Sequence, residues 1–431
     1  MAKISAGDER SLGNPYQLSV LASLFFIWGF CTALNDVLVP HLKAVFGLNY
    51  VQTMLIQFTF FGSYLVLSMP SARVIERLGY KYSMIVGLIA MGLGCLLFVP
   101  AAGVPSYGLF LSALFVLAAG ITLLQVAANP YVATLGSEKS ASARLNLIQG
   151  FNSLATVVGP LLGGILILSQ TKAGTARLAT AESLADRMVD AKAVQGPYFW
   201  IAVVLLLIAL MVWATRLPVD PTASRKVEEV KGTLLQHKNL VMGAIAIFMY
   251  VGAEVSIGSF LINYMASPHV SHMTTAEGAR YLMFYWGGAM IGRFLIGAVM
   301  LRFMAPSKML SDNCIIAIFL IALSMLSKGP LAMWAMLLVG LCNSIMFPTI
   351  FTLAIKGLGP LTGRGSGVLV TAIFGGAVIP MLQAVVADTA GLTISFVIPV
   401  ACYLYIWLFA ERTLNQGVPQ SSSADGKPSL K

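Results

Sequence analysis

Charged side chains are scarce in this sequence. They make up 10% of its 431 residues, whereas 58% of the residues are hydrophobic. A soluble protein of this length needs a more polar surface, so we expect lipid to solvate most of this chain. The apolar runs continue for about 20 residues without the alternation that a transmembrane β-barrel requires. The composition therefore predicts an all-α polytopic membrane protein.

Motifs for catalysis, nucleotide binding and metal binding are also lacking. The chain contains no GxxxxGK[ST], HExxH or GxSxG motif, which argues against an ATP-driven pump and against an enzyme. The five cysteines lie inside apolar runs without paired or metal-type spacing. The net charge of +10 comes from single basic residues between the runs rather than from a basic patch. We therefore expect no cofactor, no metal and no nucleic acid partner.

Twelve apolar runs are long enough to cross a bilayer, and they fall into two groups of six. A charged, proline-containing stretch at 218–238 separates the groups. We predict an N-terminal half (1–217), a cytoplasmic linker (218–238), a C-terminal half (239–411) and a cytoplasmic tail (412–431). The predicted spans are 17–41, 51–72, 82–102, 107–135, 145–169, 197–217, 239–265, 280–301, 308–327, 330–354, 365–390 and 393–411.

Lysine and arginine are distributed unevenly between the two sides of such a bundle. With the N-terminus inside, the cytoplasmic loops and tails hold 19 of them and the other side holds seven. Positive residues favour the cytoplasmic side, so we expect both termini to be cytoplasmic. The expected location is a bacterial inner membrane.

The two halves repeat each other weakly. A shift of 218 positions places Pro130 on Pro348 and Asp36 on Glu254, and a shift of 220 places Pro160 on Pro380. Parallel repeats of six spans are the architecture of major facilitator transporters, which hold substrate near the bilayer midplane between the halves. The repeat predicts a major facilitator fold.

Two acids stand out inside the predicted spans. An ionisable group in hydrocarbon costs about 2.5–3.5 kcal/mol on insertion scales, so Asp36 and Glu254 need a reason to be there. We predict that both face one cavity and couple transport to a cation, which would be a proton or Na⁺. Asn35 and Trp28 in the first span add a polar group and an aromatic face, which together suit a sugar. The alternatives are that Asp36 is a carboxylate at a helix end solvated by water, and that Glu254 has a purely structural role.

Amide side chains form the second candidate group. Spans four and five carry Gln125, Asn129, Gln149 and Asn152, and the repeat adds Asn343 in span ten. Amides both donate and accept hydrogen bonds, so they suit a neutral polyhydroxyl ligand better than a strongly charged one. Hydrogen bonding between helices is the alternative role.

Three arginines are candidates for a cytoplasmic gate. Arg73 and Arg77 follow span two, and Arg293 is expected low in span eight, outside the substrate site.

Three segments carry a resemblance to a known family: "LNDVLVPHLKAVF", "QVAANPYVATLGSEKSASARLNLIQGFNSL" and "YVGAEVSIGSFLINY". They resemble the fucose–galactose–glucose:proton symporters of the major facilitator superfamily, and most of all their glucose/galactose branch. The resemblance implies coupling and substrate binding by Asp36, and sugar contacts by Gln149 and Asn152. Fucose permeases carry a glutamate where this chain has Gln125, and a neutral amide where it has Glu254. Compared with fucose permeases, this chain therefore has its second intramembrane acid in the C-terminal half, at Glu254, instead of in the N-terminal half, at the position of Gln125.

Together these features predict a secondary active transporter that imports a hexose, glucose or galactose, by cation symport. We expect it to act as a monomer in the lipid bilayer. An L-fucose or N-acetylglucosamine symporter, a Na⁺-coupled transporter and an uncoupled sugar facilitator remain open alternatives.

Overall fold

The computed structural model describes residues 14–48, 50–104, 106–166, 192, 194–217, 234–271 and 273–417. For a few residues in these ranges, Asp36 among them, it describes the backbone alone. Most of the predicted linker and tail lies outside the described residues. Every regular element in the described ranges is a helix.

Within the described ranges, the first half of the chain supplies five α-helices. They are α1 (Pro15–Phe46), α2 (Tyr50–Gly103), α3 (Tyr107–Thr134), α4 (Ala141–Leu166) and α6 (Gln195–Ala214). The second half supplies nine, which are α7 (Lys238–Ala266), α8 (Thr275–Gly292), α9 (Pro306–Leu326), α10 (Gly329–Asn343), α11 (Met346–Ile355), α12 (Thr362–Thr371), α13 (Gly375–Ala390), α14 (Leu392–Ser395) and α15 (Val397–Gly417).

Eleven helical segments of the described chain are long and apolar enough to cross a membrane, and one of them is long enough to cross twice. That segment, Leu55–Gly103, has 49 residues and would extend about 74 Å, against a hydrocarbon core of about 30 Å. Inside it Gly79 leaves the helical conformation, with φ 76° and ψ 169°. Spans two and three therefore meet at Gly79, and the predicted twelve-span fold is confirmed.

Three spans are interrupted in ways that the hydropathy pattern does not reveal. Span eight ends in a π-helical turn at Arg293–Gly297 (η6), and span ten breaks between α10 and α11. Span eleven passes from α12 to α13 through a 3₁₀ turn, Ala372–Phe374 (η9). Interruptions of this kind inside a membrane must have their freed backbone groups bonded by neighbouring helices.

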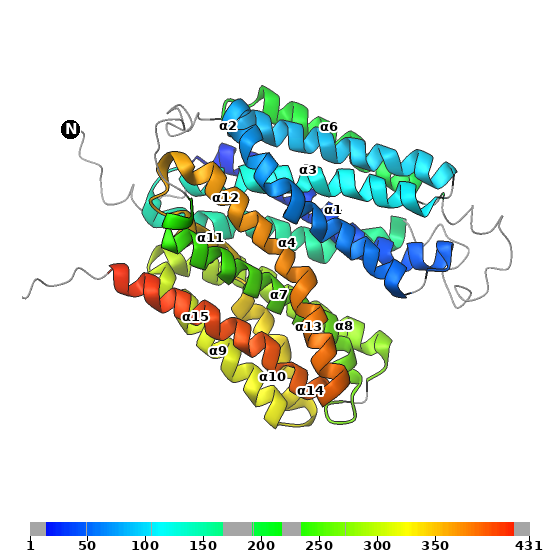
Figure 1. Ribbon diagram of the computed structural model, residues 1–431, viewed down its shortest axis with the longest axis vertical. Coiled ribbons are helices and arrows are strands. Elements are labelled where there is room, and N and C mark those ends of the chain that lie inside the picture. Colours follow the sequence, from blue (N-terminus) through cyan, green and yellow to red (C-terminus); the bar gives the residue numbers. More distant parts are fainter. Residues whose placement is uncertain are drawn as a thin grey trace, which may run out of the picture.

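The helices pack as two groups (Figure 1). In the first, α1 packs on α4, while α2 packs on α3 and α6; in the second, α7 packs on α11, α13 and α15. The groups meet where α12 lies against α2 and where α4 lies against α8 and η6. The first described residues and the end of α15 lie at the same end of the bundle, which we call the termini end.

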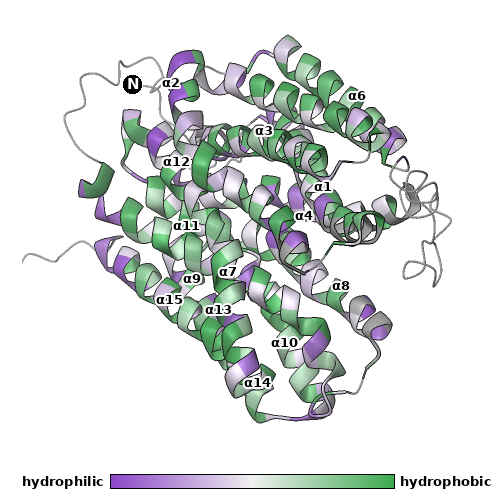
Figure 2. Ribbon diagram, turned by 45° about the vertical axis from the view of Figure 1, so that its right-hand side comes forward, coloured by the Kyte–Doolittle hydropathy of each residue, from purple (hydrophilic) through white to green (hydrophobic). Residues whose placement is uncertain are grey.

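Hydrophobic side chains cover the outside of the bundle as well as its interior. Figure 2 shows them along α6, where Trp200, Leu207 and Trp213 are each about 60% exposed or more. Exposed apolar surface on this scale would aggregate in water. It is the surface expected of a helical bundle in lipid.

Gly79 allows a direct test of the turn between spans two and three. Its φ and ψ lie in a region that is essentially restricted to glycine, where another residue costs about 1–3 kcal/mol. We expect Gly79→Ala to lower the thermal unfolding temperature of the purified protein. Gly62→Ala is the matched control, because Gly62 is helical and a Cβ there meets no atom within 4 Å. Equal unfolding temperatures for the two variants would contradict this account.

Candidate transport site

The carboxylate of Glu254 lies between two donors of its own half. The Tyr250 hydroxyl donates to Glu254 Oε1 at 2.7 Å, and Arg293 Nη2 lies 3.8 Å from the same oxygen. Tyr250 stands four residues before Glu254 on α7, so the two share one helix face. The Glu254 side chain is 14% exposed, which leaves it within reach of solvent. The negative charge of Glu254 is thus balanced by Arg293, and its carboxylate is accessible to solvent.

Arg293 also connects the two halves. Its Nε donates to the Ser344 carbonyl at 3.1 Å, and its Nη1 bonds the Ser153 hydroxyl on α4. From its sequence context, Arg293 was expected at a cytoplasmic gate, outside the substrate site. The structure instead buries it beside Glu254, about 24 Å along α7 from its start. A buried guanidinium needs a nearby counter-charge, and Glu254 supplies it.

Asn343 is held by tyrosines. Its Nδ2 donates to the Tyr285 hydroxyl at 2.8 Å, and its Oδ1 accepts a bond from the Tyr403 hydroxyl at 2.6 Å. The residue is fully buried. Because both ends of the amide have protein partners, its position favours cross-linking of spans eight, ten and twelve over the predicted sugar contact. The sequence gives no signal for these tyrosines, since apolar runs normally contain aromatic residues.

The candidate amides Gln125 and Asn129 lie on α3, and Gln149 lies on α4. Gln125 Nε2 donates to the Tyr64 hydroxyl at 2.7 Å, and Gln149 Nε2 donates to Asn129 Oδ1 at 3.1 Å. Asn152 Nδ2 reaches the Phe25 carbonyl of α1 at 3.1 Å. These bonds join helices of the N-terminal half.

Some buried polar atoms of this region have no hydrogen-bond partner among the described residues. They include Asn129 Nδ2 and Asn35 Oδ1. A buried polar atom without a partner costs free energy, which a ligand can recover by bonding it. Asn35 and Asn129 therefore have hydrogen-bonding capacity to spare.

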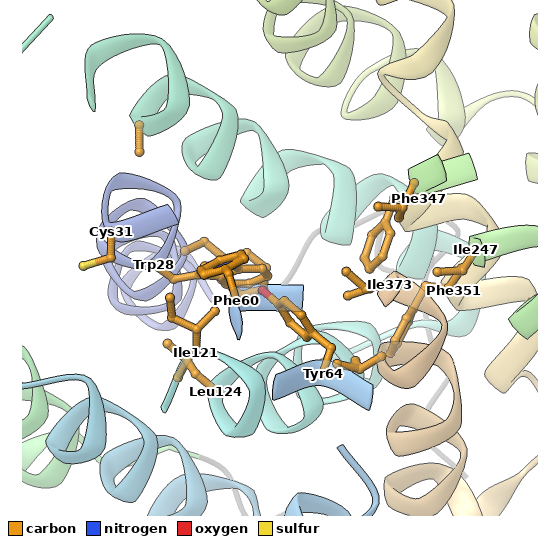
Figure 3. Packing of buried hydrophobic residues seen from close by; sticks show 14 of the residues in the cluster. Trp28, Cys31, Phe60, Tyr64, Ile121, Leu124, Ile247, Phe347, Phe351 and Ile373 are labelled. Atoms are coloured by element: carbon orange, nitrogen blue, oxygen red, sulfur yellow. The ribbon is translucent and has the colours of Figure 1, made fainter. Parts of the chain in front are cut away.

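Trp28 faces the interior of the N-terminal half. Its ring packs on Phe25 with 4.7 Å between ring centroids. Figure 3 shows Trp28 gathered with Phe60 and Tyr64, and a second aromatic group around Phe347 of the other half. Asp36 lies two turns farther along α1, but its side chain lies outside the described residues.

The halves are joined by polar contacts at the termini end. Arg364 of α12 pairs with Glu76 of α2, with 3.2 Å between Nη2 and Oε2. Lys356 lies 3.9 Å from Glu138. Ser142 and Thr352 share a hydrogen bond of 2.6 Å, and the Ser366 hydroxyl donates to the Val126 carbonyl at 2.8 Å.

Two of the arginines that the sequence suggested for the cytoplasmic gate, Arg73 and Arg77, do not bridge the halves in the described structure. Arg73 and Arg77 are exposed near this end, and neither has an ion pair with a described residue. The arginine that bridges the halves here is Arg364. In the sequence, Glu76 lies in the predicted loop after span two and Arg364 lies at the start of span eleven. The sequence contains no feature that indicates that these two residues form a pair.

The arrangement of two groups of six spans is that of a known family. The family model of the Major Facilitator Superfamily matches residues 21–381. This chain belongs to that superfamily. Its members are membrane transporters, in accord with the expectation that the chain is not an enzyme.

Similarity to individual superfamily members extends over nearly the whole chain. A "Glucose/galactose transporter" of Brucella abortus is 48% identical over 396 residues, which cover 91% of this chain and 92% of the relative. The "L-fucose-proton symporter" of Escherichia coli is 36% identical, with 94% of each chain covered. A crystal structure of FucP "in the outward conformation" superposes with a TM-score of 0.85 at 34% identity, covering 93% of this chain and 99% of that one.

The Glu76–Arg364 pair is expected to stabilise the junction between the halves. A partly exposed pair of this geometry is worth about 1 kcal/mol in a double-mutant cycle, whereas the more exposed Glu138–Lys356 pair should contribute almost nothing. We expect non-additive losses of thermal stability for Glu76→Ala and Arg364→Ala, and additive effects for Glu138→Ala and Lys356→Ala. Additive effects in both double-mutant cycles would mean that neither ion pair contributes to thermal stability.

Proposed function

We propose that this protein is a secondary active transporter that imports a hexose, glucose or galactose, by symport with a proton. The two halves would rock around a central site, so that it opens to one side of the membrane at a time. The observation that carries the proposal is the buried but accessible pair of Glu254 and Arg293 between the halves.

A coupling acid must exchange a proton with water and must change its contacts when it does so. Glu254 meets both requirements, because its side chain is partly exposed, its Oε1 accepts a hydrogen bond from Tyr250, and it forms an ion pair with Arg293. Taking up a proton removes the counter-charge of Arg293, which also bonds Ser153 of the other half. The state of the acid thereby affects the contact between the halves. Asp36, at the equivalent position of the repeat, is proposed as the second coupling group.

The polar groups proposed to bind substrate lie mainly in the N-terminal half. Gln149, Asn129, Gln125 and Asn152 supply amides, and Trp28 supplies an aromatic face. Their neutrality favours a sugar over an ionic substrate. Relatives that are named for glucose and galactose support hexose as the substrate class, and the relative named an L-fucose-proton symporter supports proton coupling.

The topology proposed from the lysine and arginine distribution places the termini end in the cytoplasm. The polar contacts between the halves at that end, Glu76–Arg364 among them, would then close the cytoplasmic side. Sugar would enter from the outside in this state. The likeness to FucP in its outward conformation supports this orientation of the cycle. Bacterial relatives support a place in the inner membrane.

Uptake by proteoliposomes tests the coupling directly. We expect labelled glucose to accumulate under an imposed proton gradient but not under a sodium gradient, with competition by galactose and not by fucose. Glu254→Gln and Asp36→Asn should abolish accumulation while retaining sugar exchange, because neither variant can ionise. Accumulation at the wild-type level in Glu254→Gln would eliminate it as a coupling acid. Equilibrating flux alone in the wild type would indicate a facilitator.

Amide substitutions test the substrate site. We expect Gln149→Ala and Asn152→Ala to raise the KM for glucose about tenfold or more, because each loses a hydrogen bond to a desolvated ligand. Asn313→Ala is the control, since Asn313 is a buried amide whose Nδ2 donates to the Met309 carbonyl of its own helix. A KM unchanged in all three variants would place the sugar elsewhere.

A further inference from the structure

The break in span ten exposes backbone carbonyls inside the membrane. Helix α10 ends at Asn343 and α11 begins at Met346. Pro348 has no N–H, so it cannot bond the carbonyl four residues earlier, that of Ser344, and its ring crowds that carbonyl. The proline thus leaves the Ser344 carbonyl without a donor in its own helix.

The two donors that hold Glu254 also bond this break. Arg293 Nε donates to the Ser344 carbonyl at 3.1 Å, and the Tyr250 hydroxyl lies 3.2 Å from the Asn343 carbonyl. The same hydroxyl is 2.7 Å from Glu254 Oε1. A phenol has one proton to donate, so Tyr250 can fully serve only one of these two acceptors at a time.

We propose that Tyr250 is a positioning residue that links the proton on Glu254 to the break in span ten. The inference rests on the proposed function, in which Glu254 exchanges a proton. With Glu254 ionised, Tyr250 donates to the carboxylate. When Glu254 takes up a proton, the acid no longer needs that donor, and the Tyr250 hydroxyl turns to the Asn343 carbonyl.

Arg293 acts in the same direction. Once Glu254 is neutral, the guanidinium keeps its bonds to the Ser344 carbonyl and to Ser153 of α4 but loses its counter-charge. Both donors are then committed to the break in span ten. Only hydrogen bonds are exchanged, and the added proton stays on Glu254. Span ten would thus differ between the loaded and the unloaded transporter.

Other titratable groups near Glu254 do not compete for its carboxylate in the described structure. Tyr285 donates to the main-chain carbonyl of Glu254 at 3.1 Å, and Tyr403 bonds Asn343. Cys342 lies in the same break region. Arg293 is the charged side chain that the described structure pairs with Glu254.

The test compares Tyr250→Phe with Tyr264→Phe. Tyr264 lies on the same helix, and its hydroxyl bonds Ser324 at 2.9 Å, away from Glu254. Glucose counterflow, proton-driven accumulation and the pH profile of uptake are measured in proteoliposomes. For Tyr250→Phe we expect counterflow within about twofold of wild type, accumulation about tenfold lower, and a pH profile moved about one unit to higher pH, because a bond to the ionised form is lost. Tyr264→Phe should resemble wild type in all three.

A second pair of variants tests the link between Glu254 and span ten by altering the break in span ten. Pro348→Ala restores an N–H that competes with Arg293 for the Ser344 carbonyl, so the pH profile should again move. Pro130→Ala, at the equivalent position of the other half, is its control and should leave the profile unchanged. Profiles of Tyr250→Phe and Pro348→Ala that match their controls would overturn the inference while leaving the proposed function intact. Absence of proton-driven uptake in the wild type would overturn both.

Discussion

A carboxylate in the middle of a membrane protein must be compensated, and the centre of this structure is organised around that requirement. Glu254 is held by Arg293 and Tyr250, and the same arginine reaches Ser153 in the opposite half. Separating Glu254 from Arg293 costs much free energy, because either charge left alone in a desolvated site is strongly unfavourable. Any change of state at Glu254 therefore affects helices of both halves.

A proline and a π-helical turn bring together the polar backbone and the arginine at this centre. Pro348 frees a carbonyl within span ten, and the π-helical turn after α8 carries Arg293 toward it. Interrupted helices are tolerated in membranes only where neighbouring groups restore the missing hydrogen bonds. In this bundle the restoring donors are the partners of the buried acid, so the local break and the charged site depend on each other.

The sequence predicted the spans and their division into two halves, because hydropathy and internal repetition are local or near-periodic signals. It did not predict that Arg293 lies beside Glu254, or that Arg364 rather than Arg73 bridges the halves. Those pairings depend on how α8 crosses α7 and how α12 meets α2, which no single segment encodes. The tyrosines around Asn343 were missed for the same reason: an apolar run gives no indication of which hydroxyl finds a partner.

The repeated prolines show how similar halves come to behave differently. Pro130 frees the Val126 carbonyl as Pro348 frees that of Ser344, yet Val126 is bonded across the junction by Ser366, whereas Ser344 is bonded by Arg293 of its own half. If the termini end opens, the Val126 carbonyl loses Ser366 but gains water, so its exposure costs little. The donor to the Ser344 carbonyl belongs to the same half and does not cross the junction. One half thus carries a carbonyl bonded across the junction, and the other carries a carbonyl bonded beside its buried acid.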